Sequence, residues 1–162
     1  MFLSWRITDD IANISVEEFD KEYNGIYGYM KLQFGDYSIG YILDETVPIE
    51  GNSEILYYIK SLIRCGVALK NRENIEIRLL NYNLIKIIVS CVDVVDVKIV
   101  NVNNNSIEGS FSLSFKELVE EIKFNYIKLY KYIEEKNKSL LKAKMVKDII
   151  SLYNEFIGML IF

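Results

Sequence analysis

The chain has 162 residues, of which 51% are hydrophobic and 26% charged, and its formal net charge is −4. This length and composition are those of an ordinary globular domain, so they exclude a disordered chain and predict a single domain over residues 1–162. The acidic balance also argues against nucleic acid as a partner.

The two ends of the chain and its two cysteines bear on the cellular compartment. The N-terminal residues lack the basic region and the long apolar run of a signal peptide. The apolar residues 156–162 are far fewer than the roughly 20 that span a bilayer. Cys65 and Cys91 lack CxxC spacing, which predicts buried, reduced thiols; a disulfide between them is the alternative. We therefore expect a cytoplasmic protein that does not bind a membrane.

The chain begins with a predicted strand and a short helix. Residues 3–7 alternate apolar and polar side chains, as in a half-buried strand. Ser15 and Glu18 have the spacing of a capping box, so a helix is expected to begin there. Asn24-Gly25 is a common helix stop and is expected to end it.

Residues 26–43 give the clearest local signal, a β-hairpin closed by Gly35-Asp36. Glycine at the first of two loop positions favours a type II′ turn, and this turn fixes the pairing of the strands. The face that is expected to point to the core carries Phe34, Tyr37, Leu32, Ile39, Met30 and Tyr41. The opposite face carries Tyr27, Tyr29, Lys31 and Gln33, with Ser38, Gly40 and Ile42 on the second strand.

A central helix and four more strands are predicted next. Residues 53–69 have apolar side chains at helical spacing. Alternating patterns predict strands over residues 75–79, 85–91, 95–99 and 107–113. Their short connections imply antiparallel pairing, because parallel strands need long crossovers. We therefore expect an antiparallel sheet of six or seven strands, formed by a hairpin plus a meander.

The last part of the chain is predicted to be helical. Ser114 and Glu117 have a second capping-box pattern. Apolar side chains mark one packed face over residues 115–133 and another over residues 141–160. The break around Asn137 predicts a helical hairpin; one long bent helix is the alternative. The expected fold class is α+β, with the antiparallel sheet packed against the central helix and this C-terminal hairpin.

The sequence lacks the residues on which most catalytic sites depend. It contains no histidine, which removes Ser-His-Asp and Cys-His sites and every zinc site that uses imidazole. It has no Walker A loop, dinucleotide fingerprint or HExxH helix. We therefore predict a protein that is not an enzyme and needs no cofactor or metal ion. A small-molecule binder or a carboxylate enzyme is the alternative, because adjacent acids such as Asp9-Asp10 are present.

Charge is distributed unevenly along the chain. Residues 9–54 contain eleven acidic and two basic side chains, a charge of −9, whereas the rest of the chain carries +5. The same segment contains five tyrosines, at positions 23, 27, 29, 37 and 41. Acidic side chains attract a basic protein, and tyrosines provide rigid contact area once it has docked. The alternative is a solvated surface that serves solubility, with the tyrosines packed beneath a helix.

This segment supplies the candidate partner-binding residues. Tyr27 and Tyr29 are predicted anchors, because both lie on the hairpin face that points away from the core. Asp36, Asp44 and Glu45 are predicted to steer a basic partner by charge.

In size, acidity, α+β layout and lack of catalytic groups, the chain resembles small acidic immunity proteins of bacterial toxin systems. Those proteins bind a cognate toxin domain, often a nuclease with a basic cleft, and block it. The resemblance implies a cytoplasmic, non-catalytic inhibitor of a basic partner protein. It is one of overall character rather than of a residue motif, so it assigns no site residues. A structural module that forms a homodimer through its helical hairpin is the alternative.

Overall fold

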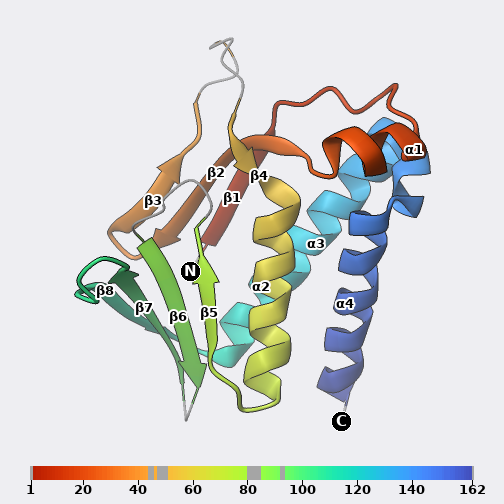
Figure 1. Cartoon of the computed structure of the whole chain (residues 1–162). Helices are drawn as coiled ribbons and strands as arrows, with labels where there is room; N and C mark the ends of the chain where they lie inside the picture. The colour runs from red at the N-terminus through yellow and green to blue at the C-terminus, as the bar shows by residue number, and fades with distance from the viewer. Residues whose placement is uncertain (1, 44–45, 47–50, 80–84, 92–93, 162) are drawn as a thin grey trace.

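The computed structural model describes residues 2–43, 46, 51–79, 85–91 and 94–161. It has an α+β fold in which two antiparallel sheets pack against helices (Figure 1). This confirms the predicted fold class, a hairpin plus a meander against a central helix and a C-terminal helical hairpin. The strands of these described residues do not form one sheet of six or seven strands, however, but two sheets of four.

The first sheet, which we call the hairpin sheet, has the strand order β1-β2-β3, and a fourth short strand, β4, also pairs with β2. Its strands are β1 (Phe2–Ile7), β2 (Tyr27–Phe34), β3 (Tyr37–Tyr41) and β4 (Ser53–Glu54). The predicted hairpin register is confirmed, because Phe34 pairs with Tyr37 and Met30 with Tyr41. Gly35 has a φ of +54°, the left-handed conformation that the turn requires of its first residue.

The second sheet, which we call the meander sheet, has its strands in chain order. They are β5 (Ile75–Arg78), β6 (Ile85–Cys91), β7 (Val95–Asn101) and β8 (Ile107–Leu113). The two sheets meet through side chains rather than through backbone pairing. The ring of Phe34 in β2 stacks on that of Phe111 in β8, with centroids 5.3 Å apart. Alternating apolar patterns correctly indicated many of the buried side chains, but such a pattern carries no information on which sheet a strand joins.

The helices are α1 (Val16–Glu18), α2 (Ile55–Lys70), α3 (Phe115–Asn137) and α4 (Lys144–Ile161). Both predicted N-terminal caps are confirmed. The Ser15 hydroxyl accepts a hydrogen bond from the Glu18 N–H at 3.1 Å. Ser114 and Glu117 bond to each other's backbone N–H in a complete capping box. A 3-10 turn, Lys138–Lys142, separates α3 from α4, so the C-terminal part is a helical hairpin and not one bent helix.

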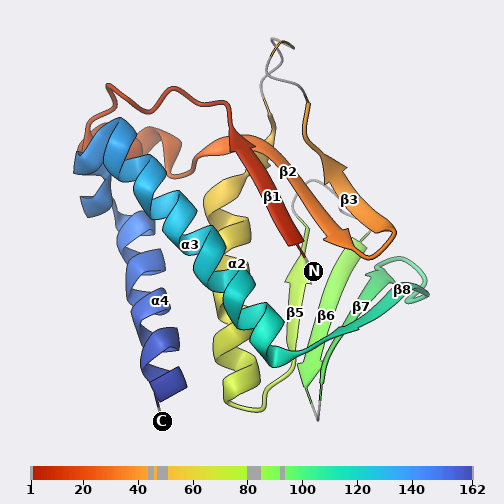
Figure 2. The same cartoon turned by 180° about the vertical axis from the view of Figure 1, so that it is seen from behind.

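Helix α2 lies at the centre of the helical layer, and both α3 and α4 pack against it (Figures 1 and 2). Gly66 explains how closely they approach. A Cβ atom at this position would lie 2.5 Å from the ring of Phe156 in α4 and 2.6 Å from the side chain of Ile122 in α3. Gly66 is therefore the point at which the three helices meet.

Side chains of α3 cover the outer edge of β1 and tie it to the helix. The Glu121 carboxylate accepts a hydrogen bond from the Leu3 N–H, and the Lys128 ammonium donates one to the Trp5 carbonyl at 2.9 Å. The Trp5 indole N–H donates to Asn125 at 2.8 Å. The bonds to the Leu3 N–H and the Trp5 carbonyl satisfy backbone groups that an uncovered edge strand would offer to another chain.

Candidate functional site

The solvent-facing side of the hairpin sheet is the candidate site, and we call it the outer face. It carries Phe2, Ser4 and Arg6 from β1, Tyr27, Tyr29, Lys31 and Gln33 from β2, and Ser38 and Tyr41 from β3. In Figure 2, β1 to β3 lie side by side, and α3 runs along the β1 edge. Tyr27 and Tyr41 are 40% and 57% exposed, and Ile42 is exposed as well. The outer face thus presents large aromatic and apolar side chains to solvent.

The expectation that Tyr29 presents its ring to solvent is wrong, because this residue is only 4% exposed. It lies outside the main hydrophobic core, on the predicted face, but neighbouring side chains cover it. The Arg6 guanidinium sits 5.0 Å above its ring, and the Tyr41 ring lies 5.9 Å away. Arg6 pairs with Tyr29 across β1 and β2, which brings its long side chain over the ring. Tyr29 is therefore a buried side chain against which the exposed Tyr41 packs.

Tyr41 was expected to face the core, and this prediction is also wrong. The preceding residue, Gly40, has a φ of +78°, which interrupts the regular alternation of side chains along β3. Tyr41 consequently lies beside Tyr29 on the outer face. A glycine inside a predicted strand was the sequence signal for this irregularity, since such glycines often mark bulges and bends.

The charges on the outer face differ from the expected acidic surface. Its central charged side chains are the cations Arg6 and Lys31. The described acids lie toward its ends: Asp36 is in the hairpin turn, and Asp9 accepts a hydrogen bond from the Tyr27 N–H at 2.7 Å. The eight residues of β2 separate these ends by roughly 23–26 Å. Asp44 and Glu45 lie outside the described residues.

Several acids of residues 9–54 have structural partners. The Glu54 carboxylate caps α2 by accepting hydrogen bonds from two N–H groups of its first turn, at 2.6 and 3.0 Å, and burial raises the pKa of this carboxyl group. Asp20 accepts a hydrogen bond from the Lys144 N–H at the start of α4, at 2.9 Å. Glu17 forms an ion pair with Lys21 at 2.6 Å. Part of the −9 charge therefore serves the fold.

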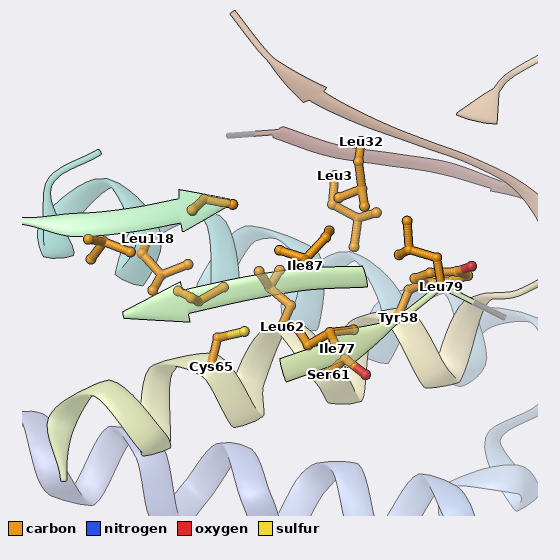
Figure 3. A pocket seen from close by; sticks show the side chains of 13 residues that line it. Leu3, Leu32, Tyr58, Ser61, Leu62, Cys65, Ile77, Leu79, Ile87 and Leu118 are labelled. Atoms are coloured by element: carbon orange, nitrogen blue, oxygen red, sulfur yellow. The ribbon is translucent and has the colours of Figure 1, made fainter. Parts of the chain in front are cut away.

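An internal cavity of about 40 Å³ lies between the two sheets and α2 (Figure 3). Its lining is almost entirely apolar and includes Leu32, Leu62 and Ile87. Ligand sites usually have about 300–1,000 Å³, so this cavity has room for a water molecule or two but not for a substrate. Among the described residues, no carboxylate lines it, and no group of three or more acids and cysteines is arranged to hold a metal ion. This cavity is therefore too small for a substrate, whereas a more open hollow of about 720 Å³ between β1 and α3 is lined by Glu117, Glu120 and Glu121.

Cys65 borders this cavity as a buried free thiol, while the side chain of Cys91 lies outside the described residues. Burial raises the pKa of the Cys65 thiol to about 12, so it stays protonated and unreactive at neutral pH. We expect a Cys91→Ser variant, in which Cys65 is the only thiol, to resist an aromatic disulfide reagent until denaturant unfolds the protein. Rapid labelling under native conditions would contradict the burial and restore Cys65 as a candidate nucleophile.

Comparison of the chain with protein-family models, with curated proteins and with solved structures gives no match. Among the described residues, no helix combines the length and the apolar character that crossing a membrane requires.

Proposed function

We propose that the protein is a non-catalytic protein-binding module, and that it binds its partner through the outer face of the hairpin sheet. The observation that carries this proposal is the exposed ring of Tyr41 beside the supported ring of Tyr29, with the exposed Tyr27 two residues before Tyr29 on the same face of β2. Tyrosine and arginine are enriched in the buried centres of protein interfaces, and the outer face contains both.

The strands hold these aromatic residues in place before any partner arrives. Tyr27 is fixed at its backbone by Asp9, and Tyr41 rests against Tyr29, which Arg6 covers. Rigid aromatic side chains lose little conformational entropy on binding, so a supported group of this kind is well suited to hold a partner.

The charge pattern narrows the chemistry of the partner. The net charge of −9 over residues 9–54 favours a basic protein at long range. At contact, Lys31 matches a carboxylate or carbonyl acceptor opposite the centre of the outer face, whereas the Arg6 guanidinium already donates to the Leu43 carbonyl at 3.1 Å. Asp36 matches a cation near one end of this face. Such a partner is a basic protein whose contact surface carries both hydrogen-bond acceptors and cations. An immunity-type inhibitor that blocks a toxin domain is the member of this class that the proposal favours.

Affinity capture from a lysate of the source cell tests the proposal when outer-face variants are compared. The wild-type protein is expected to retain a basic protein, and a Tyr27→Ala, Tyr41→Ala double variant is expected to lose it. Tyr23→Ala is the matched control, because Tyr23 is 47% exposed but lies in the short π-helix Phe19–Tyr23 that precedes β2 and not in a strand of the outer face. Retention of the same protein by the double variant would show that the outer face is not the binding surface.

A further inference from the structure

The hollow between β1 and the start of α3 adjoins the outer face. It has a volume of about 720 Å³ and lies where α3 runs along the edge of the hairpin sheet (Figure 2). Phe2 and Ser4, which belong to the outer face, also line the hollow. The outer face and the hollow are therefore one continuous surface, and a protein that docks on the strands also meets α3.

Two phenylalanine rings are exposed at this hollow, one from each of its walls. Phe2 of β1 is 65% exposed and Phe124 of α3 is 62% exposed, which makes them the most exposed aromatic side chains in the described part of the chain. Apolar surface that is gathered at one place and rimmed by polar groups marks a binding surface.

The hollow carries a negative charge. Among the described residues, three carboxylates and one ammonium group line it, those of Glu117, Glu120, Glu121 and Lys116. Hydrogen bonds from Ser114 lower the pKa of the Glu117 carboxyl group, so this group stays ionised at neutral pH. Glu120 pairs with Lys123 at 3.5 Å on the exposed surface, where such a pair is weak and another cation can replace it.

Glu121 has a carboxylate oxygen to spare. The residue is only 7% exposed, and its Oε1 accepts hydrogen bonds from the Leu3 N–H and from the Asn125 side chain. Within the described residues, Oε2 has no hydrogen-bond partner, and it is not one of the fully buried atoms that lack one. A carboxylate in so buried a position is stabilised by a further donor. Oε2 is thus available to a donor that enters the hollow.

We propose that the hollow binds an arginine side chain of the basic partner protein, an inference that rests on the proposed function. A guanidinium group stacks on aromatic rings and donates hydrogen bonds in its plane to carboxylates, so it matches the rings and the acids together. The hollow also supplies what the centre of the outer face lacks. The charged side chains there are Arg6 and Lys31, which do not attract a basic protein.

NMR titration with a capped amino acid tests the hollow without the partner. Nα-acetylarginine amide is expected to shift the backbone amide signals of residues 116–124 and of β1 saturably, with a dissociation constant of roughly 1–30 mM. The citrulline derivative has the same shape without the charge, and the lysine derivative has the charge without the planar group. Both are expected to bind about fivefold more weakly or worse.

A double variant, Glu120→Gln with Glu121→Gln, removes both charges and keeps the shape of the side chains. Glutamine at position 121 still offers Oε1 to the Leu3 N–H, and the amide spectrum without ligand shows whether the fold is retained. Binding of the arginine derivative is expected to weaken about tenfold or more. Glu134→Gln with Glu135→Gln is the matched control, because these two acids are also adjacent and exposed on α3 but do not line the hollow.

Phe124→Ala is a second test that leaves the bonds of Glu121 in place. It is expected to weaken binding of the arginine derivative about threefold or more, whereas Ile127→Ala, an exposed position of α3 outside the hollow, leaves binding unchanged. Shifts that do not saturate, or equal binding of the citrulline or lysine derivative, overturn the proposal.

Failure of this inference is distinguishable from failure of the proposed function. The Tyr27→Ala, Tyr41→Ala variant keeps the hollow and should bind the arginine derivative as the wild type does, even if the outer face proves not to be the binding surface. Conversely, a captured partner that is lost by this variant and retained at full strength by Phe124→Ala would confirm the outer face and exclude the hollow from the interface.

Discussion

Replacing Leu129 with alanine is expected to lower the free energy of unfolding by about 2–5 kcal/mol, the usual range for truncation of a buried leucine. Leu129 is 2% exposed on the apolar face of α3, which also carries the buried Val119, Ile122 and Ile133. The substitution removes apolar burial and leaves a cavity, since packing around α2 prevents the neighbouring residues from collapsing into it. Denaturant unfolding followed by circular dichroism measures the change.

Ile127→Ala on the same helix is the control for this measurement. Ile127 is 46% exposed, so its truncation should change the free energy of unfolding by much less than that of Leu129. Alanine also has the higher helix propensity, so neither variant weakens α3 by itself. A loss below about half a kcal/mol for Leu129→Ala would show that this face of α3 does not pack as the structure describes.

Local chemistry explains which parts of the fold the sequence predicted. The hairpin register follows from Gly35 in a two-residue turn, and the starts of α1 and α3 follow from Ser15 and Ser114. Each of these features is decided within about four residues. The division into two sheets depends instead on a contact between residues far apart in the chain, the stacking of Phe34 on Phe111. Strand patterns show which side chains are buried but not which strands pair.

The candidate site was predicted less well for the same reason. The pattern of β2 placed Tyr27 and Tyr29 correctly on one face, but the exposure of Tyr29 depends on Arg6, which belongs to another strand. The net charge of residues 9–54 was visible in the sequence. The sequence did not show the tertiary role of acids such as Glu54, whose carboxylate accepts hydrogen bonds from the start of α2 and from the Ile26 N–H. A sum of charges cannot distinguish a capping carboxylate from a free one.

The two kinds of residue in the proposed interface should separate in binding kinetics once a partner is captured. Tyr41→Ala is expected to speed dissociation about 30-fold, the equivalent of roughly 2 kcal/mol for an interface hot spot, and to leave the salt dependence of association unchanged. Removal of the steering charges is expected to slow association and to flatten its salt dependence, because such charges act at a distance and are screened by salt. The two variants that test this are the single variant Asp36→Asn and the double variant Asp44→Asn, Glu45→Gln. Surface plasmon resonance at several salt concentrations measures both rates.

Tyr29→Ala adds an internal check on this scheme. Tyr29 is buried beneath Arg6 and beside Tyr41, so its truncation should lower the free energy of unfolding and also speed dissociation, since Tyr41 loses its support. Tyr41→Ala removes an exposed side chain and should affect dissociation alone. If dissociation is unchanged in both variants while Tyr29→Ala still destabilises the fold, the tyrosines are structural and the partner binds elsewhere. The basic surface around Lys138, Lys142 and Lys144 is then the next region to test, because these lysines are exposed and lie in the part of the chain that carries the excess of positive charge.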